Sequence, residues 1–523
     1  MKRSLKTVLL ICVAALLAYW VYSRSGSPEP STVSEQLSLA WSQAPRTLDP
    51  RYAIDADSQY LENLLHCSLI DFDEAGNVVP DLASSWTWSE DNTSLTVFLK
   101  PDIRFSDGNY VTAEDVTALY EFLISKDHKT PSPRAGAFSG LQSITHKQQS
   151  VTFHLKKPDA SFLSNLSVGI LPKQYNKEKV VTSEDQVHGC GPYQLSSSDF
   201  SLIQLDANPW YRSGELPQIP RLNIRIVRDE TTRLAKLRNG EVDLSQNNIS
   251  RDKIAAVEEH YPELRIMRRS GLKTTYLAFN MNNQHLKNPA VRKAISLAIN
   301  RNKIIHYILR DMAIPATTLL PPDHFYYNRQ LEPPEYDPTR AEALLEEAGF
   351  HKEADGMRFN LSYKTSNDET RVSIARAIAS DLSSIGIRTH VQPLEWGRFK
   401  EDVDGGKAEM WSLIWTGFKD PDIYRYVFAS ESFPPHGGNR GRYSSERLDK
   451  VLMTARVTTD PDQRKALYDQ AQLLIAEAVP YAFLFHEENY VIMKKNIGGF
   501  KIYADGRFAS LIKTYRQPAI LPH

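Results

Sequence analysis

A strand, a tight turn and a capped helix follow one another in residues 86–116, and this order limits the fold more than any other part of the chain. Apolar side chains recur at every second position of residues 95–99, which is the period of a strand with one buried face. Asp107 and Gly108 then form a turn pair, because glycine adopts a positive φ without steric cost. Thr112 lies three residues before Asp115, which is typical of a helix N-cap. The segment has no residues arranged for catalysis, so we interpret it as a structural unit.

Strands and helices alternate further along the chain, which indicates an α/β layer. Residues 222–226 alternate as a strand, and Asp229 is placed to cap a helix over residues 231–238 that Gly240 ends. Another strand begins at residues 242–244. Two more helices are predicted where a capping residue precedes a proline, at Asn288 and Pro289 and at Asp337 and Pro338. A chain of 523 residues is long enough for more than one domain.

Short motifs spaced along the chain resemble those of one family. They are Leu48-Asp49-Pro50, Val111-Thr112-Ala113-Glu114-Asp115-Val116, Gly189-Cys190-Gly191-Pro192-Tyr193, Asn208-Pro209-Trp210-Tyr211, Leu237-Arg238-Asn239-Gly240-Glu241-Val242-Asp243, Leu277-Ala278-Phe279-Asn280 and Val291-Arg292-Lys293-Ala294. In this order they are similar to the motifs of the family 5 extracytoplasmic solute-binding proteins, the dipeptide and oligopeptide receptors of ABC importers. Ser106 stands where the family has histidine, a change that a turn position absorbs.

The resemblance implies an α/β fold of the periplasmic-binding-protein type II-like class, with two lobes around a ligand cleft and an additional subdomain. Projected onto this chain, lobe I comprises residues 35–70, 188–272 and 488–523, the extra subdomain comprises residues 71–187, and lobe II comprises residues 273–487. The chain crossings near residues 272 and 488 would then be hinges. A ligand would bind between lobes that close on it.

The resemblance also implies a function. An extracytoplasmic receptor of this kind captures peptides in the interlobe cleft and delivers them to a membrane permease of an ABC importer. We therefore expect a peptide or other small solute and the permease as partners, a monomeric receptor, and no cofactor. The alternative class is a membrane-tethered sensor on the same fold, which would signal occupancy without transport. Within the receptor class, a metal complex or a sugar is the rival to a peptide ligand.

In this family a strand that ends in tryptophan, followed by a short acidic loop, lines the cleft. The matching positions here are Trp415, Thr416, Gly417, Phe418 and Asp420, and Tyr276 and Asn280 lie on the segment that enters lobe II. The peptide receptors use an aspartate just after this strand to pair with the α-ammonium of the peptide, because a desolvated ammonium needs a charged acceptor.

This chain departs from that pattern. Phe418 falls at the aspartate position, with Lys419 beside it. Either a one-residue gap lets Asp420 serve as the anchor, or the anchor for a free amine is absent, which would favour an N-blocked peptide or another solute class. A core position for Trp415 and a loop-capping role for Asp420 are the structural alternatives, and Asn280 is expected to satisfy local backbone groups.

The N-terminus has the pattern of an exported protein. Three basic residues, Lys2, Arg3 and Lys6, precede an apolar run over residues 7–22. No small-x-small cleavage site follows, and bulky residues rather than small ones precede Cys12, which argues against lipidation there. Residues 1–24 are therefore a signal peptide or, as we favour, an uncleaved membrane anchor. Residues 25–34 would form a flexible tether, with the remainder on the periplasmic or cell-surface side of the cytoplasmic membrane.

Cys67 and Cys190 remain as one possible pair in an oxidising compartment. The sequence does not give their separation, and we slightly favour two buried free thiols.

Several function classes are not supported by the sequence. The net charge is −1 and there is no basic arm, which argues against a nucleic-acid partner. The chain has no GxSxG, HExxH, P-loop or CxxC motif, so we do not expect an enzyme. Its 14 histidines lack metal-ligand spacing, and His486 with Glu487 and Glu488 is interpreted as a solvated turn rather than a metal site.

Overall fold

The computed structural model describes residues 36–125, 132–177, 180–182, 185, 188–214, 216–333 and 335–517. The expected anchor, the tether and Cys12 lie outside the described residues. Within the described ranges, the structure contains no helix with the length and apolar character needed to span a bilayer. The names lobe I, lobe II and extra subdomain are kept below for the residue ranges given above.

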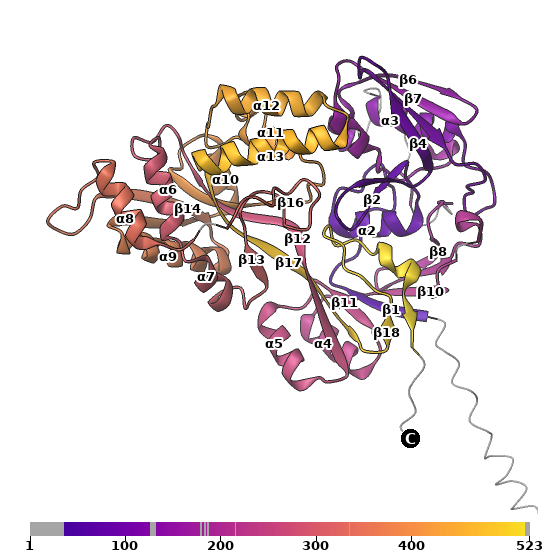
Figure 1. Cartoon of the computed structure of the whole chain (residues 1–523). Coiled ribbons are helices and arrows are strands. Elements are labelled where there is room, and N and C mark those ends of the chain that lie inside the picture. The colour runs from indigo at the N-terminus through magenta and orange to yellow at the C-terminus, as the bar shows by residue number, and fades with distance from the viewer. Residues whose placement is uncertain are drawn as a thin grey trace, which may run out of the picture.

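One mixed sheet of 11 strands runs through the molecule, in the order β15-β14-β16-β12-β17-β11-β1-β10-β9-β8, with β13 paired to β17 (Figure 1). The strands are β1 (Gln36–Trp41), β8 (Tyr193–Ser198), β9 (Leu202–Ala207), β10 (Arg221–Ile226), β11 (Leu244–Gln246), β12 (Leu264–Phe279), β13 (Ala313–Pro315), β14 (Phe359–Ser366), β15 (Ile387–Leu394), β16 (Met410–Thr416) and β17 (Tyr481–Lys494). The long antiparallel strands β12 and β17 lie in the middle of this order and belong to both halves of the molecule.

In lobe II, helices cover both faces of the sheet (Figure 1). One hydrophobic core contains side chains of α6 (Pro289–Ala298), α7 (Arg301–Tyr307), α8 (Pro338–Glu347) and α9 (Glu369–Ser384). A second core contains side chains of α10 (Trp396–Asp404), α11 (Ile423–Phe428), α12 (Glu446–Val457) and α13 (Pro461–Ala478). The helices predicted at the two capping residues followed by proline are confirmed, since Asn288 and Asp337 each accept a hydrogen bond from a backbone N–H of the first turn.

In lobe I, β1 pairs in parallel with β10 and β11, and α4 (Glu230–Asn239) and α5 (Arg251–His260) precede and follow β11. The predicted strand at residues 222–226 is β10. The helix predicted after Asp229 is α4, and it is one residue longer at each end. Gly240 ends it with φ +80°, a conformation that favours glycine. This lobe also contains α2 (Ala56–Leu65), β18 (Ile497–Gly498), β19 (Tyr515–Arg516) and two short helices, η5 (Tyr211–Gly214) and η7 (Ala509–Lys513).

The extra subdomain has its own antiparallel sheet, in the order β4-β5-β7-β6, with α3 packed against it. Its elements are β4 (Ala83–Trp88), β5 (Ser94–Leu99), α3 (Ala113–Ile124), β6 (Leu141–Lys147) and β7 (Ser150–Leu155), and the short pair β2 (Ile70–Phe72) and β3 (Val78–Pro80) precedes them. The capping box predicted at Thr112 and Asp115 is confirmed. Leu95, Val97 and Leu99 are buried in the core that α3 completes, so the predicted strand, turn and helix form one unit.

A disulfide joins Cys67 and Cys190, so the expectation of free thiols is wrong. The chain leaves α2 just before Cys67 and returns at Cys190 after the extra subdomain, which brings their Cα atoms to 5.0 Å. The two glycines that flank Cys190 allow this close approach. A Cβ on Gly189 would lie 1.9 Å from the backbone oxygen of Leu65, and one on Gly191 would lie 2.5 Å from its backbone carbon.

The strands shared by the two lobes are irregular where they pass between them. The pairing of β12 with β17 shifts register between Ser270 and Thr274. His486 lies in β17 opposite Thr274 and is completely buried, so its interpretation as part of a solvated turn is wrong. The Thr274 hydroxyl donates to the Leu319 carbonyl (2.6 Å) and accepts from Nδ1 of His486 (2.9 Å). Burial lowers the pKa of His486 to about 3, so the ring stays neutral.

Candidate ligand-binding cleft

A cleft of about 1010 Å³ lies between lobe II and the other two parts of the molecule. One wall comes from α2 and from two short helices of the extra subdomain, η1 (Ala135–Phe138) and η2 (Ala160–Leu166), together with residues just after β7. The opposite wall comes from the loop after β16, from α11 and from the C-terminal end of α12. The resemblance places a ligand between the two lobes, and here the extra subdomain supplies most of the wall that faces lobe II.

The loop after β16 carries those predicted site residues that reach the cleft. Gly417, Phe418 and Asp420 line it, as does Lys419. Gly417 has φ +73° and donates its N–H to the Leu272 carbonyl (3.1 Å), which turns the chain away from β12 at the end of the strand.

The other predicted site residues lie outside the cleft lining. Thr416 is exposed and pairs with Lys273 of β12. Trp415 packs in a ring stack with Tyr276, with 6.0 Å between ring centres, and Tyr276 stacks in turn on Tyr481 at 4.2 Å. Tyr276 is 1% exposed and belongs to a hydrophobic core.

Asn280 has a local structural role, in agreement with the expectation that it satisfies backbone groups. Its side-chain amide donates to the carbonyls of Gly406 and Ala408, both at 3.0 Å. Its side-chain oxygen accepts from the N–H of Asn282. It therefore orders the backbone at the end of β12.

The carboxylate of Asp420 faces Arg464 of α13, which is buried. The Oδ1 atom accepts from Arg464 (2.9 Å), from the Ser161 hydroxyl (3.0 Å) and from the backbone N–H of Asp422 (2.8 Å). The Oδ2 atom accepts from Arg464 (3.1 Å) and from the Ser164 hydroxyl (2.7 Å). Burial alone would raise the pKa of Asp420, but the guanidinium and these hydrogen bonds hold it below its usual value.

Asp422, two residues further on, has the opposite electrostatic environment. Burial raises its pKa to about 6, although Arg425 lies 3.0 Å away and favours the charged form. The neighbouring charge of Asp420 adds to the increase. The loop therefore holds one carboxylate that stays charged and one that gains a proton as the pH falls through about 6.

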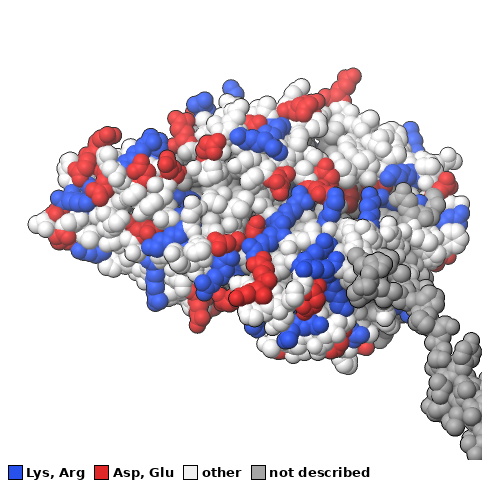
Figure 2. Space-filling view, turned by 60° about the horizontal axis from the view of Figure 1, so that its bottom comes forward, with Lys and Arg blue, Asp and Glu red and all other residues white. Residues whose placement is uncertain are grey.

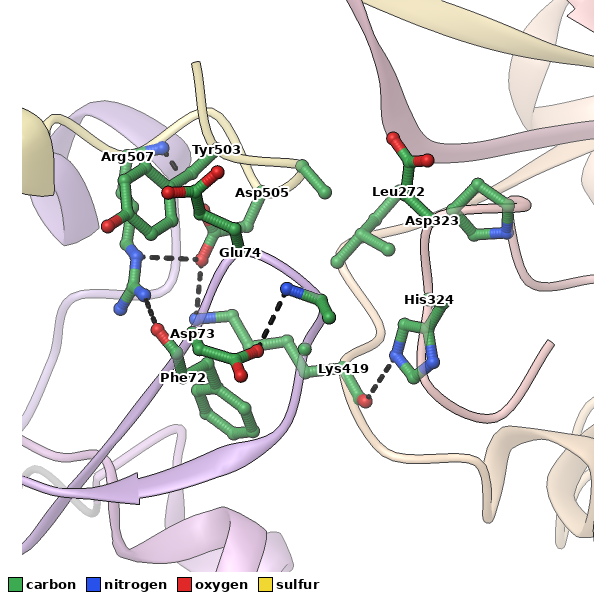
Figure 3. Close-up of a pocket in the computed structure, with 14 residues that line it drawn as sticks. Phe72, Asp73, Glu74, Leu272, Asp323, His324, Lys419, Tyr503, Asp505 and Arg507 are labelled. Atoms are coloured by element: carbon green, nitrogen blue, oxygen red, sulfur yellow. Dashed lines mark hydrogen bonds and ion pairs between the residues drawn. The ribbon is translucent and has the colours of Figure 1, made fainter. Parts of the chain in front are cut away.

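Lys419 connects the same loop to lobe I at a small pocket that adjoins the cleft (Figure 3). Its ammonium lies 2.8 Å from Asp505 and 4.8 Å from the ring centre of Phe72. Its carbonyl accepts a hydrogen bond from Nε2 of His324 (3.0 Å), while Nδ1 of that ring accepts from the N–H of Tyr326. Burial lowers the pKa of His324 to about 4, which keeps the ring neutral with its proton on Nε2.

Sequence reasoning missed the partners of Asp420. Ser161 and Ser164 come from η2 of the extra subdomain and lie 259 and 256 residues from Asp420 along the chain. Arg464 comes from α13 and lies 44 residues from Asp420. No short motif marks these positions. Only the folded structure brings them together.

The described residues contain no group of three or more His, Cys, Asp or Glu side chains that could hold a metal ion. On the face that Figure 2 shows, Lys and Arg side chains lie among Asp and Glu side chains. This mixture fits the balanced total of 62 basic and 63 acidic residues.

Two lobes that share the strands of one sheet and enclose a cleft of this size define a solute-binding protein. The model of the bacterial extracellular solute-binding proteins, family 5 Middle, matches residues 77–434, and the chain belongs to this family. The family consists of binding proteins for transport rather than catalysts.

Relatives match over nearly the whole chain. Di/tripeptide-binding protein 2 of Pseudomonas aeruginosa (strain UCBPP-PA14) is 28% identical over 521 residues, which cover 93% of this chain and 95% of the relative. HbpA2 from Haemophilus parasuis has a similar structure, with a TM-score of 0.84 at 24% identity, over 92% of this chain and 100% of the other. The oligopeptide-binding protein AppA from Bacillus subtilis, in complex with a nonapeptide, gives a TM-score of 0.68 at 25% identity, over 92% and 99%. The predicted family and the two-lobe type II fold class are thus confirmed.

Proposed function

We propose that this protein captures peptides in the interlobe cleft and delivers them to the membrane permease of an ABC importer. The cleft volume of about 1010 Å³ carries the proposal, because it lies at the upper end of the range for small-molecule sites, about 300–1,000 Å³, and leaves room for several residues. The relatives named for di- and tripeptide binding and for a bound nonapeptide support a peptide as the ligand.

We infer that the loop from Thr416 to Asp420 forms one wall of the peptide-binding site. Gly417 and Phe418 present backbone and a flat apolar face to the cleft, and such surfaces hold a peptide main chain without strong side-chain preference. Trp415, Tyr276 and Asn280 would not contact the peptide directly. Their packing and hydrogen bonds would hold in place the strands next to the loop.

The work of such a receptor is differential binding by open and closed arrangements of the lobes, without covalent chemistry. We propose that it acts as a monomer, outside the cytoplasm, with no nucleic-acid partner. The expected N-terminal anchor would keep it close to its permease. The near-neutral net charge and the interspersed surface charges support the absence of a nucleic-acid partner.

The test is a thermal shift measurement on the purified full-length chain with a mixed library of di- to pentapeptides. A ligand that binds only the native state at about 100 times its Kd stabilises it by about 2.7 kcal/mol, which is readily measured. Native mass spectrometry of the same samples identifies the bound peptides.

A matched pair of variants shows where the peptides bind. Ala137 is exposed and lines the cleft, so Ala137→Trp fills part of it. Ala255 is exposed on α5, away from the cleft lining, and Ala255→Trp is the control. We expect the first variant to abolish the peptide-induced shift and the second to retain it. No shift with any peptide at millimolar concentration, or equal shifts in both variants, would contradict the proposal.

A further inference from the structure

The charges that line the cleft point to the class of peptide it takes, an inference that rests on the proposed function. We propose that the ligand is anchored by a carboxylate and carries no free α-ammonium, as in an N-acylated peptide. A peptide with a free N-terminus brings an ammonium into the cleft, and an ammonium that loses its water there needs a carboxylate with unused hydrogen-bonding capacity.

The carboxylates of the described cleft lining already have cationic partners within the protein. They are Glu62, Asp159, Asp420, Asp422 and Glu431. Each is paired with an arginine of this chain, at 2.5 Å (Arg134), 3.0 Å (Arg456), 2.9 Å (Arg464), 3.0 Å (Arg425) and 2.9 Å (Arg425) respectively. Arg425 serves both Asp422 and Glu431, so an incoming ammonium would have to compete with a guanidinium at each of these carboxylates.

Asp420 is the clearest case, because it lies beside the position where the family has its amine anchor. A carboxylate offers about four lone-pair sites. Asp420 already receives five donors, two of them from Arg464, which is 5% exposed. Its position thus fits a clamp between the extra subdomain and lobe II, and no site remains on it for a ligand.

The cations of the cleft are not balanced in the same way. Lys156 and Lys157 follow β7 and line the cleft. The ammonium of Lys156 donates to the Ser139 carbonyl (2.7 Å), and the described part of the chain shows no acidic partner for either lysine. The charge left available to a ligand is therefore positive, which suits a carboxylate.

The experiment compares one mixed tripeptide library in three forms: unmodified, N-acetylated, and N-acetylated with a C-terminal amide. The half-saturating concentration is measured by thermal shift on the full-length chain. We expect N-acetylation to lower it by about threefold or more, because the acetylated peptide brings no ammonium that must lose its water without a partner. We expect amidation of the acetylated library to raise it by about tenfold or more, the size of one lost charge-assisted hydrogen bond.

Lysine variants locate the anchor. In Lys156→Gln/Lys157→Gln the effect of amidation should fall below about threefold, whereas Lys293→Gln, an exposed control on α6, should keep it. A half-saturating concentration that N-acetylation leaves unchanged or raises overturns the inference and leaves the proposed function standing, as does an amidation effect that persists in the double variant. If none of the three libraries shifts the transition, the proposed function itself fails.

Discussion

Asp420→Asn tests whether this residue is a structural clamp. The substitution removes the charge opposite Arg464, leaves that buried guanidinium without an anionic partner, and places an amide donor among five donors. Breaking a buried ion pair at one side costs about 3–5 kcal/mol. Because the Asp420 side chain keeps 17% exposure, we expect the lower end, about 3 kcal/mol.

The cost is measured as a change in melting temperature. If lobe II unfolds as a unit, about 3 kcal/mol corresponds to a decrease of about 6–12 °C, by the scaling for units of 150–250 residues. The double variant Asp420→Asn/Arg464→Met removes both charges, and we expect it to be less destabilised than the sum of the single variants by about 2 kcal/mol. Additive effects, or a decrease below about 2 °C for Asp420→Asn, would refute the clamp.

The clamp also predicts how the difference in stability between wild type and Asp420→Asn changes with pH. The folded pKa of Asp420 is depressed, so its stabilisation is fully present above the unfolded pKa of about 4 and is lost as the pH falls through the folded value. The Asp420 contribution to the difference between wild type and Asp420→Asn should thus stay constant from about pH 8 to about pH 5 and narrow only in acid. It is measured with Asp422→Asn in both backgrounds, because the charge of Asp420 also raises the pKa of Asp422. A difference that already closes near pH 6 would contradict this assignment.

Three further predictions concern Cys67, Gly189 and Cys190, where the chain enters and leaves the extra subdomain, and Asp422 in the loop after β16. The double variant Cys67→Ala/Cys190→Ala removes a disulfide that closes a loop with a sequence separation of 123. The chain entropy of the unfolded state then lowers the free energy of unfolding by up to about 5 kcal/mol. We expect a lower melting temperature that no longer changes when reductant is added. Gly189→Ala forces a Cβ against the Leu65 carbonyl and should reduce the yield of folded protein, whereas Gly136→Ala, in open space, should not. The pKa of Asp422 is raised to about 6, so the protonated side chain stabilises the native state. As the pH rises from about 4 through 6, the free energy of unfolding of the wild type should therefore fall relative to that of Asp422→Asn. Parallel curves of unfolding free energy against pH for the two proteins would contradict this.

Local structure was readable from the sequence wherever a short segment determines its own conformation. The capping box at Thr112, the caps at Asn288 and Asp337, and the glycine after α4 all occur as predicted. Each of these features depends on residues a few positions apart, so no tertiary contact is needed to infer it. The alternation over residues 95–99 likewise identified the buried face of β5.

The errors and omissions concern contacts between distant segments. The pairing of Cys67 with Cys190 depends on the path of the whole extra subdomain, and the burial of His486 depends on β12 and β13 lying on both sides of β17. Arg464, the partner of Asp420, is likewise fixed only by the packing of α13 against the loop. A single sequence records none of these distances. The sequence therefore left open whether Asp420 anchors a ligand amine or has a structural role in its loop.

The two strands shared by the lobes also determine how the molecule would move. An antiparallel pair of strands is a ribbon: it resists stretching and sliding, because either would break its ladder of hydrogen bonds, but it twists readily. The pairing of β12 with β17 shifts register between Ser270 and Thr274 and again between Thr275 and Tyr276, so torsion would concentrate there. Closing the cleft would then be a rotation about one axis. Ligands of different length would stop that rotation at different angles, rather than require different paths.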